Sequence, residues 1–373
     1  MKVSRLIASA AILASASLAL TACDPPMPPE VAAQIAEQTY TCVEGNATVS
    51  SPALMSDIVA GWADALTYAC IDDPYTTDVV EQPTMTFTVA DGTEASVDAE
   101  ISDYPAACSA GQTVPLAVDA GVLVYMESDL SSFAVSPKSL AGILNGTITN
   151  WNQLAADNPG TDIPDLPISI VPEADKLALK SLSDYSAAQG NPITSSVFTG
   201  VNHPSLDLYS ALDETGSYRV PTLQEGQMAI VPNSYAVSLG LYAASIYLGM
   251  DKETESPILA TPDLAGIYAG STQWVVTKDA NSIALKLDPS IQAQPAPGFD
   301  IAPSPYQAIY PVNYYTCNSS SLLPNAIGRF ILRLDSQGSI GASNYAQLPE
   351  FIRIESLAMI SKGLPTPTPT PTE

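Results

Sequence analysis

Short apolar runs alternate with helix-like patterns along most of this chain. The runs at residues 85–89, 122–125 and 168–171 have the length and composition of strands. Strands that alternate with amphipathic helical segments are typical of α/β proteins. We therefore predict an α/β fold between two Pro-rich ends.

Two helices are indicated by their end signals and apolar spacing. In the first, over residues 136–146, Ser136 can cap the helix, Pro137 suits its first turn and Gly146 suits the residue after its end. The second is predicted over residues 326–335, with Gly338 beyond it. Its apolar residues share one face: Ile327, Phe330, Ile331 and Leu334. Both helices are expected to be scaffolding.

The N-terminal segment has the organisation of a secretory signal peptide. Lys2 and Arg5 precede an apolar run over residues 6–20, and small residues follow it. The run is shorter than the roughly 20 apolar residues that span a bilayer. The ending Leu-Thr-Ala-Cys at residues 20–23 resembles the lipobox of bacterial lipoproteins, whose cysteine is acylated and becomes the new N-terminus. The resemblance implies removal of residues 1–22 and a lipid anchor on Cys23 at the extracytoplasmic face of a bacterial cell membrane. Plain secretion is the alternative.

Both ends of the mature chain are rich in proline. Residues 23–39 carry the acylated cysteine and a Pro-rich spacer, and residues 364–373 are a Pro-Thr tail. Such segments are extended rather than packed. Membrane contact is expected only through the anchor.

The chain is strongly acidic, with a formal net charge of −26 from 39 Asp and Glu against 13 Lys and Arg. Residues 24–137 contain 18 acidic residues and no Lys or Arg, and Lys138 is the first cation after the signal segment. This charge makes nucleic acids and anionic lipids poor partners. A soluble acidic surface accounts for it, and a field that recruits cations is the functional alternative.

Four cysteines remain besides Cys23, an even number that suits disulfide bonds outside the cytoplasm. Three pairings are open, and we favour Cys42 with Cys70 and Cys108 with Cys317. Zinc binding is the alternative, but the chain has no C-x-x-C spacing and a single histidine, His203. We predict no metal site and no cofactor.

Several segments, in order along the chain, resemble the phosphate-binding (PstS-like) proteins of ABC importers. The most specific are Ile-Thr-Asn-Trp at residues 148–151 and Asn-Pro-Gly at residues 158–160. Similar ligand-loop and strand segments occur at residues 49–54 with Trp62, 102–105, 228–236, 310–311 and 345–349. The resemblance covers roughly residues 40–362.

The resemblance implies a two-lobed periplasmic-binding-protein fold (type II-like), each lobe a mixed sheet flanked by helices. Lobe 1 would comprise residues 40–121 plus 310–363, and lobe 2 residues 122–309. A monomer would capture a small polar solute or anion and deliver it to an ABC permease.

The loop that holds phosphate in that family is altered in this chain. Its Arg-Ser-Asp-Gly-Ser-Gly-Thr-Thr sequence would follow residues 168–171, where this chain has Pro172 and then Glu173 in place of the arginine. Asp175 is retained, Lys176 and Ala178 stand for glycines, and two leucines stand for hydroxyl residues. Losing a charge-assisted contact and adding a carboxylate about 4 Å from phosphate predicts an affinity weaker by about three to five powers of ten. Alternatively, the register is shifted and Lys176 or Lys180 turns inward as the cation.

The resemblance also marks candidate ligand-binding residues. In the family, the aspartate matching Asp103 accepts the proton of hydrogen phosphate, and here Asp103 beside Glu173 would suit a cation, an amine or a neutral polar ligand. The alternative is that Ser102 and Asp103 cap a helix. The full candidate set is Ser50, Ser51, Thr93, Asp103, Glu173, Asp175 and Lys176.

Two function classes follow from these observations. The first is a lipid-anchored solute-binding protein with weak or lost phosphate binding. The second is a surface or interaction lipoprotein that keeps the fold but binds no solute. An enzyme is not expected, because neither G-x-S-x-G nor H-E-x-x-H occurs.

Overall fold

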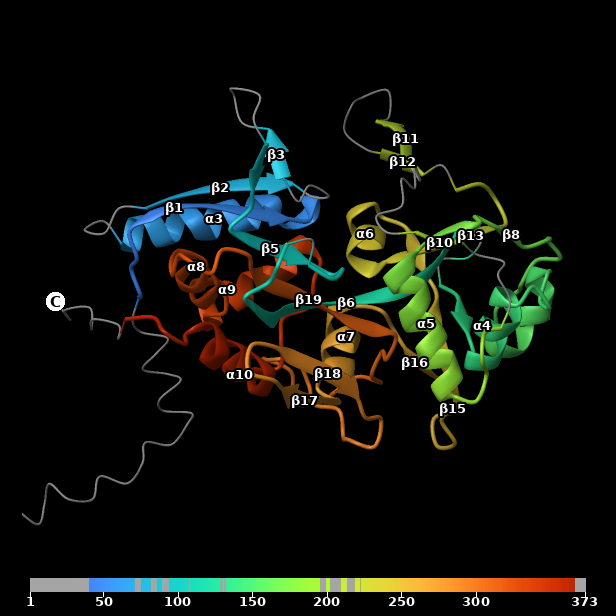
Figure 1. Ribbon diagram of the computed structural model, residues 1–373. Helices are drawn as coiled ribbons and strands as arrows, with labels where there is room; N and C mark the ends of the chain where they lie inside the picture. Colours follow the sequence, from blue (N-terminus) through green and yellow to red (C-terminus); the bar gives the residue numbers. More distant parts are fainter. Residues whose placement is uncertain are drawn as a thin grey trace, which may run out of the picture. The chain divides into compact units, whose positions relative to one another are not determined.

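The longest strand of the protein, β6 (Gln112–Tyr125), organises the fold of this computed structural model (Figure 1). The structure describes residues 40–70, 75–81, 86–88, 94–106, 108–127, 130, 132–194, 199–201, 209–212, 219–221 and 223–365. Residues 41–366 belong to one compact unit. The predicted signal segment, Cys23, the Pro-rich spacer, Thr93, His203 and residues 366–373 of the predicted tail lie outside the described residues.

Strands and helices alternate in much of the chain, as the apolar pattern predicts. The other strands are β1 (Gly45–Ser51), β2 (Tyr75–Glu81), β3 (Thr86–Thr88), β4 (Glu94–Ser96), β5 (Ala99–Ser102), β7 (Ala134–Val135), β8 (Ser169–Ile170), β9 (Glu173–Asp175), β10 (Thr199–Val201), β11 (Tyr209–Leu212), β12 (Arg219–Pro221), β13 (Gln227–Pro232), β14 (Tyr242–Ala243), β15 (Ser245–Met250), β16 (Pro257–Ala260), β17 (Trp274–Lys278), β18 (Ile283–Leu287) and β19 (Ile309–Thr316). The helices are α3 (Ala53–Ala69), α4 (Pro137–Leu144), α5 (Lys176–Ala188), α6 (Asn233–Ser238), α7 (Leu264–Ser271), α8 (Leu323–Ile331), α9 (Leu334–Ser339) and α10 (Glu350–Ile360), with 3-10 helices η1 (Trp151–Asp157) and η2 (Ile340–Ser343).

Strand β6 changes its partner half-way along. Residues 112–120 pair antiparallel with β19, and residues 121–125 pair antiparallel with β13. The main sheet has the order β2-β1-β5-β19-β6-β13-β8, with parallel and antiparallel neighbours, and β14 also pairs with β6. The expected mixed α/β sheet is confirmed. The change of partner lies next to the expected limit between residues 121 and 122, whereas the division into two lobes remains a prediction.

Helices pack on both parts of this sheet. Helix α3 packs on β1 and β2, α10 packs on β6, and α5 packs on β6 and β13. At Gly121 the contact between α5 and β6 is so close that a Cβ would overlap the carbonyl oxygen of Ala178 and the hydroxyl of Ser181. The hydroxyl of Tyr306 also donates to the carbonyl of Gly121, at 2.8 Å. Gly121 therefore marks the point where the two parts of the sheet meet.

The family-like Ile-Thr-Asn-Trp segment has a structural role. Asn150 caps η1 in a reciprocal pair of hydrogen bonds with Gln153. Trp151 is fully buried, with its ring centroid 5.9 Å from that of Tyr125 and 4.9 Å from that of Phe133. Asn158 accepts from the Ala134 N–H at 2.8 Å. These contacts stabilise the packing beside β6, and none of them involves a candidate ligand residue.

The first predicted helix is confirmed and the second is corrected. Ser136 caps α4 by accepting from the Ser139 N–H at 3.2 Å, and Gly146 follows with a φ of 69°. The predicted helix over residues 326–335 is instead two helices, α8 and α9, because Arg333 adopts an extended conformation between them. The side chain of Leu334 is 57% exposed, so it does not continue the apolar face of α8.

The predicted strands lie at the positions of observed strands, but their lengths are not always as predicted. Residues 122–125 are the end of β6, and residues 168–171 contain the two-residue β8. Within residues 85–89, the described part is β3, and residues 85 and 89 lie outside it.

Both favoured disulfides are present. Cys42 bonds to Cys70 and joins the segment before β1 to the end of α3, and Cys108 bonds to Cys317 and joins the β5–β6 connection to the end of β19. The open question of pairing is therefore settled among these four cysteines.

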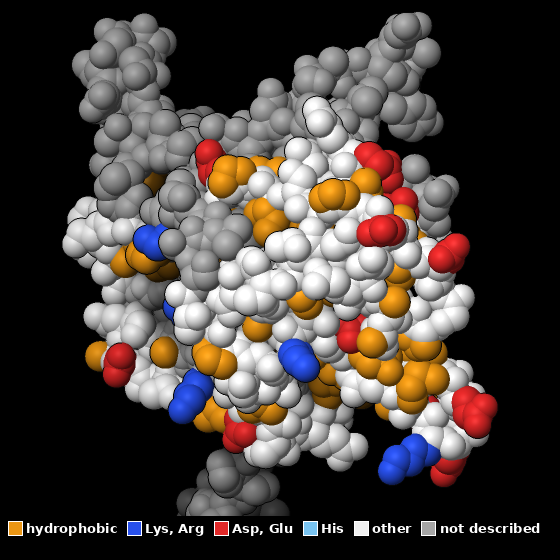
Figure 2. All heavy atoms as spheres, turned by 90° about the vertical axis from the view of Figure 1, so that its right-hand side faces the viewer, with side chains coloured by type: hydrophobic (Ala, Val, Ile, Leu, Met, Phe, Trp, Pro, Cys, Tyr) orange, Lys and Arg blue, Asp and Glu red, His pale blue; other side chains and the backbone are white. Residues whose placement is uncertain are grey.

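The described surface agrees with the charge analysis. On the face shown in Figure 2, Lys and Arg side chains lie singly rather than in a patch, with acidic side chains between them. Among the described helices, none combines the length and the apolar character needed to cross a bilayer.

Candidate functional site

Asp175 lies at the N-terminus of α5, where the sequence places the altered phosphate loop. Its carboxylate accepts from the N–H groups of Leu177, at 2.9 Å, and Ala178, at 2.8 Å, and so caps the helix. The hydroxyl of Tyr104 donates to its other oxygen. Only 2% of Asp175 is exposed, so a carboxyl group occupies the end of the helix that would otherwise attract an anion.

Asp119 is a second buried carboxyl, and sequence analysis missed it. It lies within β6, is 1% exposed, and accepts from the N–H of Ala120 at 2.7 Å. Ser234 at the start of α6 donates to it through its N–H, at 3.1 Å, and its hydroxyl, at 2.6 Å. The available signal was a single carboxylate inside the otherwise apolar run at residues 114–125.

Asp103 follows β5 and keeps partial access to solvent. The alternative that Ser102 and Asp103 cap a helix is wrong, because residues 103–105 form bends and the next element is β6. Burial, followed by the charges of Asp175 and Asp119, raises the pKa of Asp103 from 3.8 to about 7.

Asp103, Asp119 and Asp175 therefore interact electrostatically, and we call them the acidic cluster. Burial raises the pKa of Asp119 to about 7, even though the Ser234 and Ala120 hydrogen bonds favour the ionised form and oppose the rise. The charge of Asp175 adds to the rise. Sequence analysis expected Glu173 beside Asp103, whereas the carboxyls that raise the pKa of Asp103 are Asp175 and Asp119.

Tyrosines surround the acidic cluster. Tyr310 pairs with Asp119 across β19 and β6 and is 7% exposed, and its hydroxyl has no hydrogen-bond partner among the described residues. Burial and the charges of Asp119, Asp175 and Asp103 raise the pKa of Tyr310 well above 10. Tyr345 has a raised pKa from burial and from Asp119 and Asp103, opposed by a hydrogen bond with Ser234.

The main causes of the pKa shifts of Asp103 and Asp119 are burial, neighbouring carboxyls and hydrogen bonds, and no Lys or Arg is among them. Lys176 is exposed at the first residue of α5, and Lys180 is exposed and pairs with Asp184. Glu173 is half-buried in β9. In the described part of the chain, neither lysine proposed as an inward-turned replacement for the arginine is buried.

Ser50 and Ser51 are buried at the end of β1, directly before α3. The hydroxyl of Ser51 donates to the carbonyl of Pro52 at 3.3 Å. Their role as ligand residues stays a prediction, as does that of Glu173 and Lys176.

Among the described residues, Glu100, Cys108 and Cys317 form a group of potential metal ligands whose ligand atoms lie within 4.8 Å of one another. Both cysteines are joined in a disulfide, so their sulfurs cannot act as thiolate ligands. This group does not fit a metal.

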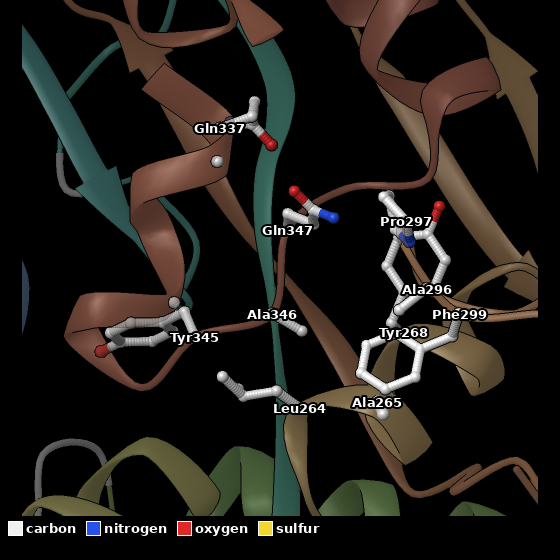
Figure 3. A pocket seen from close by; sticks show the side chains of 12 residues that line it. Leu264, Ala265, Tyr268, Ala296, Pro297, Phe299, Gln337, Tyr345, Ala346 and Gln347 are labelled. Carbon is white, nitrogen blue, oxygen red and sulfur yellow. The ribbon is translucent and has the colours of Figure 1, made fainter. Parts of the chain in front are cut away.

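Tyr345 also lines an apolar cavity of about 270 Å³ (Figure 3). Leu264, Tyr268 and Phe299 line it, and the hydroxyl of Tyr345 points away from Tyr268 and Phe299. The Gln337 amide at its edge donates to the carbonyl of Leu116 at 3.1 Å and is already engaged. Polar and ionisable chemistry is therefore concentrated at the acidic cluster rather than in this cavity.

A comparison with protein-family models finds no match, and neither does a comparison with curated proteins. Among solved structures, the chain is similar to a high-affinity periplasmic phosphate-binding protein (PfluDING) with bound phosphate, at 13% identity and a TM-score of 0.51. It is similar to the ancestral soluble variant of the Human Phosphate Binding Protein at 12% identity and to a DING protein at 13%, both with a TM-score of 0.50. Each match covers 85% of this chain and 93% of the other. At these identities the likeness shows the fold, and it confirms the expected periplasmic-binding-protein-like architecture.

Proposed function

We propose that this protein is a lipid-anchored, extracytoplasmic solute-binding protein in which strong phosphate binding has been lost. The shared fold, the signal-like N-terminus and the lipobox-like cysteine at position 23 support a binding role outside the cytoplasm. Delivery of the solute by a monomer to an ABC permease is part of the same proposal. The role proposed is binding, not catalysis.

The observation that carries this proposal is the acidic surrounding of the α5 N-terminus, where Asp103, Asp119 and Asp175 act on one another electrostatically. Phosphate sites on helix N-termini combine free N–H groups with a cation. Here the carboxylate of Asp175 accepts from the N–H groups of Leu177 and Ala178, and Glu173 stands at the position that matches the family's arginine.

The electrostatic cost decides against tight phosphate binding. Each carboxylate about 4 Å from a phosphate charge repels it by about 4 kcal/mol at an effective dielectric constant of about 20. A missing charge-assisted hydrogen bond removes about 1.5–3 kcal/mol more. Either effect alone weakens binding by at least about tenfold.

The test is a calorimetric and thermal-shift titration of the protein with orthophosphate at pH 7.5. We expect no saturable binding at micromolar phosphate. The variant Glu173→Arg restores a cation at the position that matches the family's arginine, and we expect it to bind phosphate at least about tenfold more tightly than the unmodified protein.

Glu253→Arg is the matched control, because it makes the same charge change at an exposed residue in the β15–β16 turn. It should leave phosphate binding unchanged. Saturable micromolar binding by the unmodified protein would contradict the loss of phosphate binding, while leaving a solute-binding role intact.

A further inference from the structure

The hydroxyl of Tyr310 is a buried polar group without a hydrogen-bond partner among the described residues. Leaving such a group unsatisfied destabilises the folded protein, so it calls for an explanation. Its residue pairs with Asp119 across the sheet, and all three carboxyls of the acidic cluster act on it electrostatically. A ligand held at the cluster would supply the missing partner.

The hydrogen bonds of the cluster show which carboxyl can contact such a ligand. Asp175 is engaged by Leu177, Ala178 and Tyr104, and Asp119 is engaged by Ala120 and Ser234. Among the described residues, the hydrogen bonds to Asp103 come from backbone groups, its own N–H and that of Tyr104, and Asp103 keeps access to solvent. Asp103 and Tyr310 can therefore accept further hydrogen bonds from a ligand, and Asp119 and Asp175 add negative charge to the site.

The spacing of the carboxyls distinguishes between kinds of cation. Ca²⁺ holds its oxygen ligands at 2.3–2.6 Å, so coordinating oxygens lie close to one another. Among the described residues, the group of potential metal ligands whose ligand atoms all lie within 4.8 Å of one another is Glu100 with Cys108 and Cys317. It includes none of the three carboxyls of the acidic cluster. The cluster is thus too open for a single metal ion bound by all three, whereas an organic cation needs only one direct carboxylate contact and a negative surrounding field.

We propose that the acidic cluster and Tyr310 bind a ligand that carries a protonated amine. An ammonium group donates to the carboxylate of Asp103 and to the hydroxyl oxygen of Tyr310, and the charges of Asp119 and Asp175 offset its desolvation. The strongly acidic chain favours the approach of such a ligand. This inference rests on the proposed function, since it names the class of solute for the same site.

Binding of the amine should strengthen as pH rises from 6 to 8. The titratable groups that face Asp103 are Asp119 from β6, Asp175 from the start of α5, and the tyrosines 310, 315 and 345, which stay protonated in this range. A carboxyl that ionises near pH 7 changes from about one-tenth to about nine-tenths ionised between pH 6 and pH 8. Affinity should therefore increase about tenfold over this interval.

The experiment is a thermal-shift and calorimetric titration with two primary amines, ethylamine and 1,4-diaminobutane. Each is compared with its uncharged counterpart, ethanol or 1,4-butanediol, at constant ionic strength in a buffer without primary amines. We expect saturable binding of an amine at pH 8, about tenfold weaker binding at pH 6, and no saturable effect of either alcohol.

Three variants locate the effect. Asp103→Asn should weaken amine binding at least tenfold and remove most of its pH dependence, and Tyr310→Phe should weaken it while keeping the pH dependence. Asp162→Asn removes a negative charge at an exposed residue and should leave binding unchanged.

The outcomes separate this inference from the proposed function. Failure of both amines to bind at pH 8, or equal binding to Asp103→Asn, would overturn the amine specificity. If an alcohol or orthophosphate then binds saturably, the solute-binding function stands with a different ligand. If none of the probes binds, these data support neither the amine specificity nor the proposed solute-binding function.

Discussion

Asp119 shows how one side chain in a strand can determine the chemistry of a site. Its carboxyl is enclosed between β6, β19 and α6 and is held by Ser234 and Ala120. Enclosure disfavours the ionised form, and these hydrogen bonds recover only part of that cost. Asp119 is therefore a group whose protonation affects both stability and the charge of the site.

The raised pKa values make a prediction about stability. Asp103 and Asp119 have pKa values of about 7 in the folded protein and near 4 when unfolded. Between pH 4 and pH 7 the folded state binds more protons, so the stability that these groups contribute is present at low pH and is lost as pH rises through 7. We expect Asp119→Asn, which cannot ionise, to raise the melting temperature by several degrees more at pH 8 than at pH 5. Calorimetric scans at the two pH values measure this difference.

Asp162→Asn again serves as the control, and its effect on the melting temperature should be the same at both pH values. An equal effect of Asp119→Asn at pH 5 and pH 8 would show that Asp119 ionises normally.

At the scale of elements, the contact between α5 and β6 places Asp175 near Asp119. Helix α5 reaches β6 directly at Gly121, because that residue has no Cβ to separate them. Asp175, which caps α5, thereby lies close enough to Asp119 in β6 for its charge to raise the pKa of Asp119.

Replacing this glycine should be costly. In Gly121→Ala the new methyl would overlap the Ala178 carbonyl oxygen, and we expect the free energy of unfolding to fall by about 1–3 kcal/mol or more. Urea unfolding measures the change.

Gly61 in α3 is the matched control, since a Cβ there meets nothing within 4 Å. Gly61→Ala should stabilise the protein by up to about 1 kcal/mol, because alanine is the better helix former. A similar small gain for Gly121→Ala would show that α5 can move away from β6 at little cost.

Helices α8 and α9 show how an amphipathic pattern can predict a helix that is too long. The apolar spacing continues through Leu334, but Arg333 bonds to Asp335 at 3.1 Å, and its guanidinium carbon lies 5.5 Å from the ring centre of Phe330. These contacts accompany an extended residue between the two helices. Such contacts between side chains cannot be predicted from the periodicity of a sequence.

At the scale of the folded unit, the two disulfides differ in the length of chain that they close. Cys42 and Cys70 are 28 residues apart, and Cys108 and Cys317 are 209 residues apart. The longer loop loses more conformational freedom in the unfolded state when it is closed.

We therefore expect the double variant Cys108→Ser/Cys317→Ser to lose more stability than Cys42→Ser/Cys70→Ser. Loop-closure entropy predicts losses of about 5 and about 3.5 kcal/mol. Urea unfolding midpoints of the two variants, each with and without reductant, measure the order. The reverse order would mean that native-state packing around Cys42 and Cys70, rather than loop length, dominates.

The sequence by itself determined the local features of this protein. The ends of α4, the α/β class and the presence of disulfides were predictable, because capping residues and apolar spacing act through near neighbours and an even cysteine number is a matter of composition. The pairing itself was one of three that the sequence left open, and it joins Cys108 to Cys317, 209 residues away. The absence of an arginine from residues 172–175, directly before α5, is also a property of the sequence itself. The acidic cluster was decided by the tertiary structure alone. Its members follow β5, lie within β6 and precede α5, and only the pairing of β6 with β19 and its close contact with α5 bring their charges together and enclose them from water.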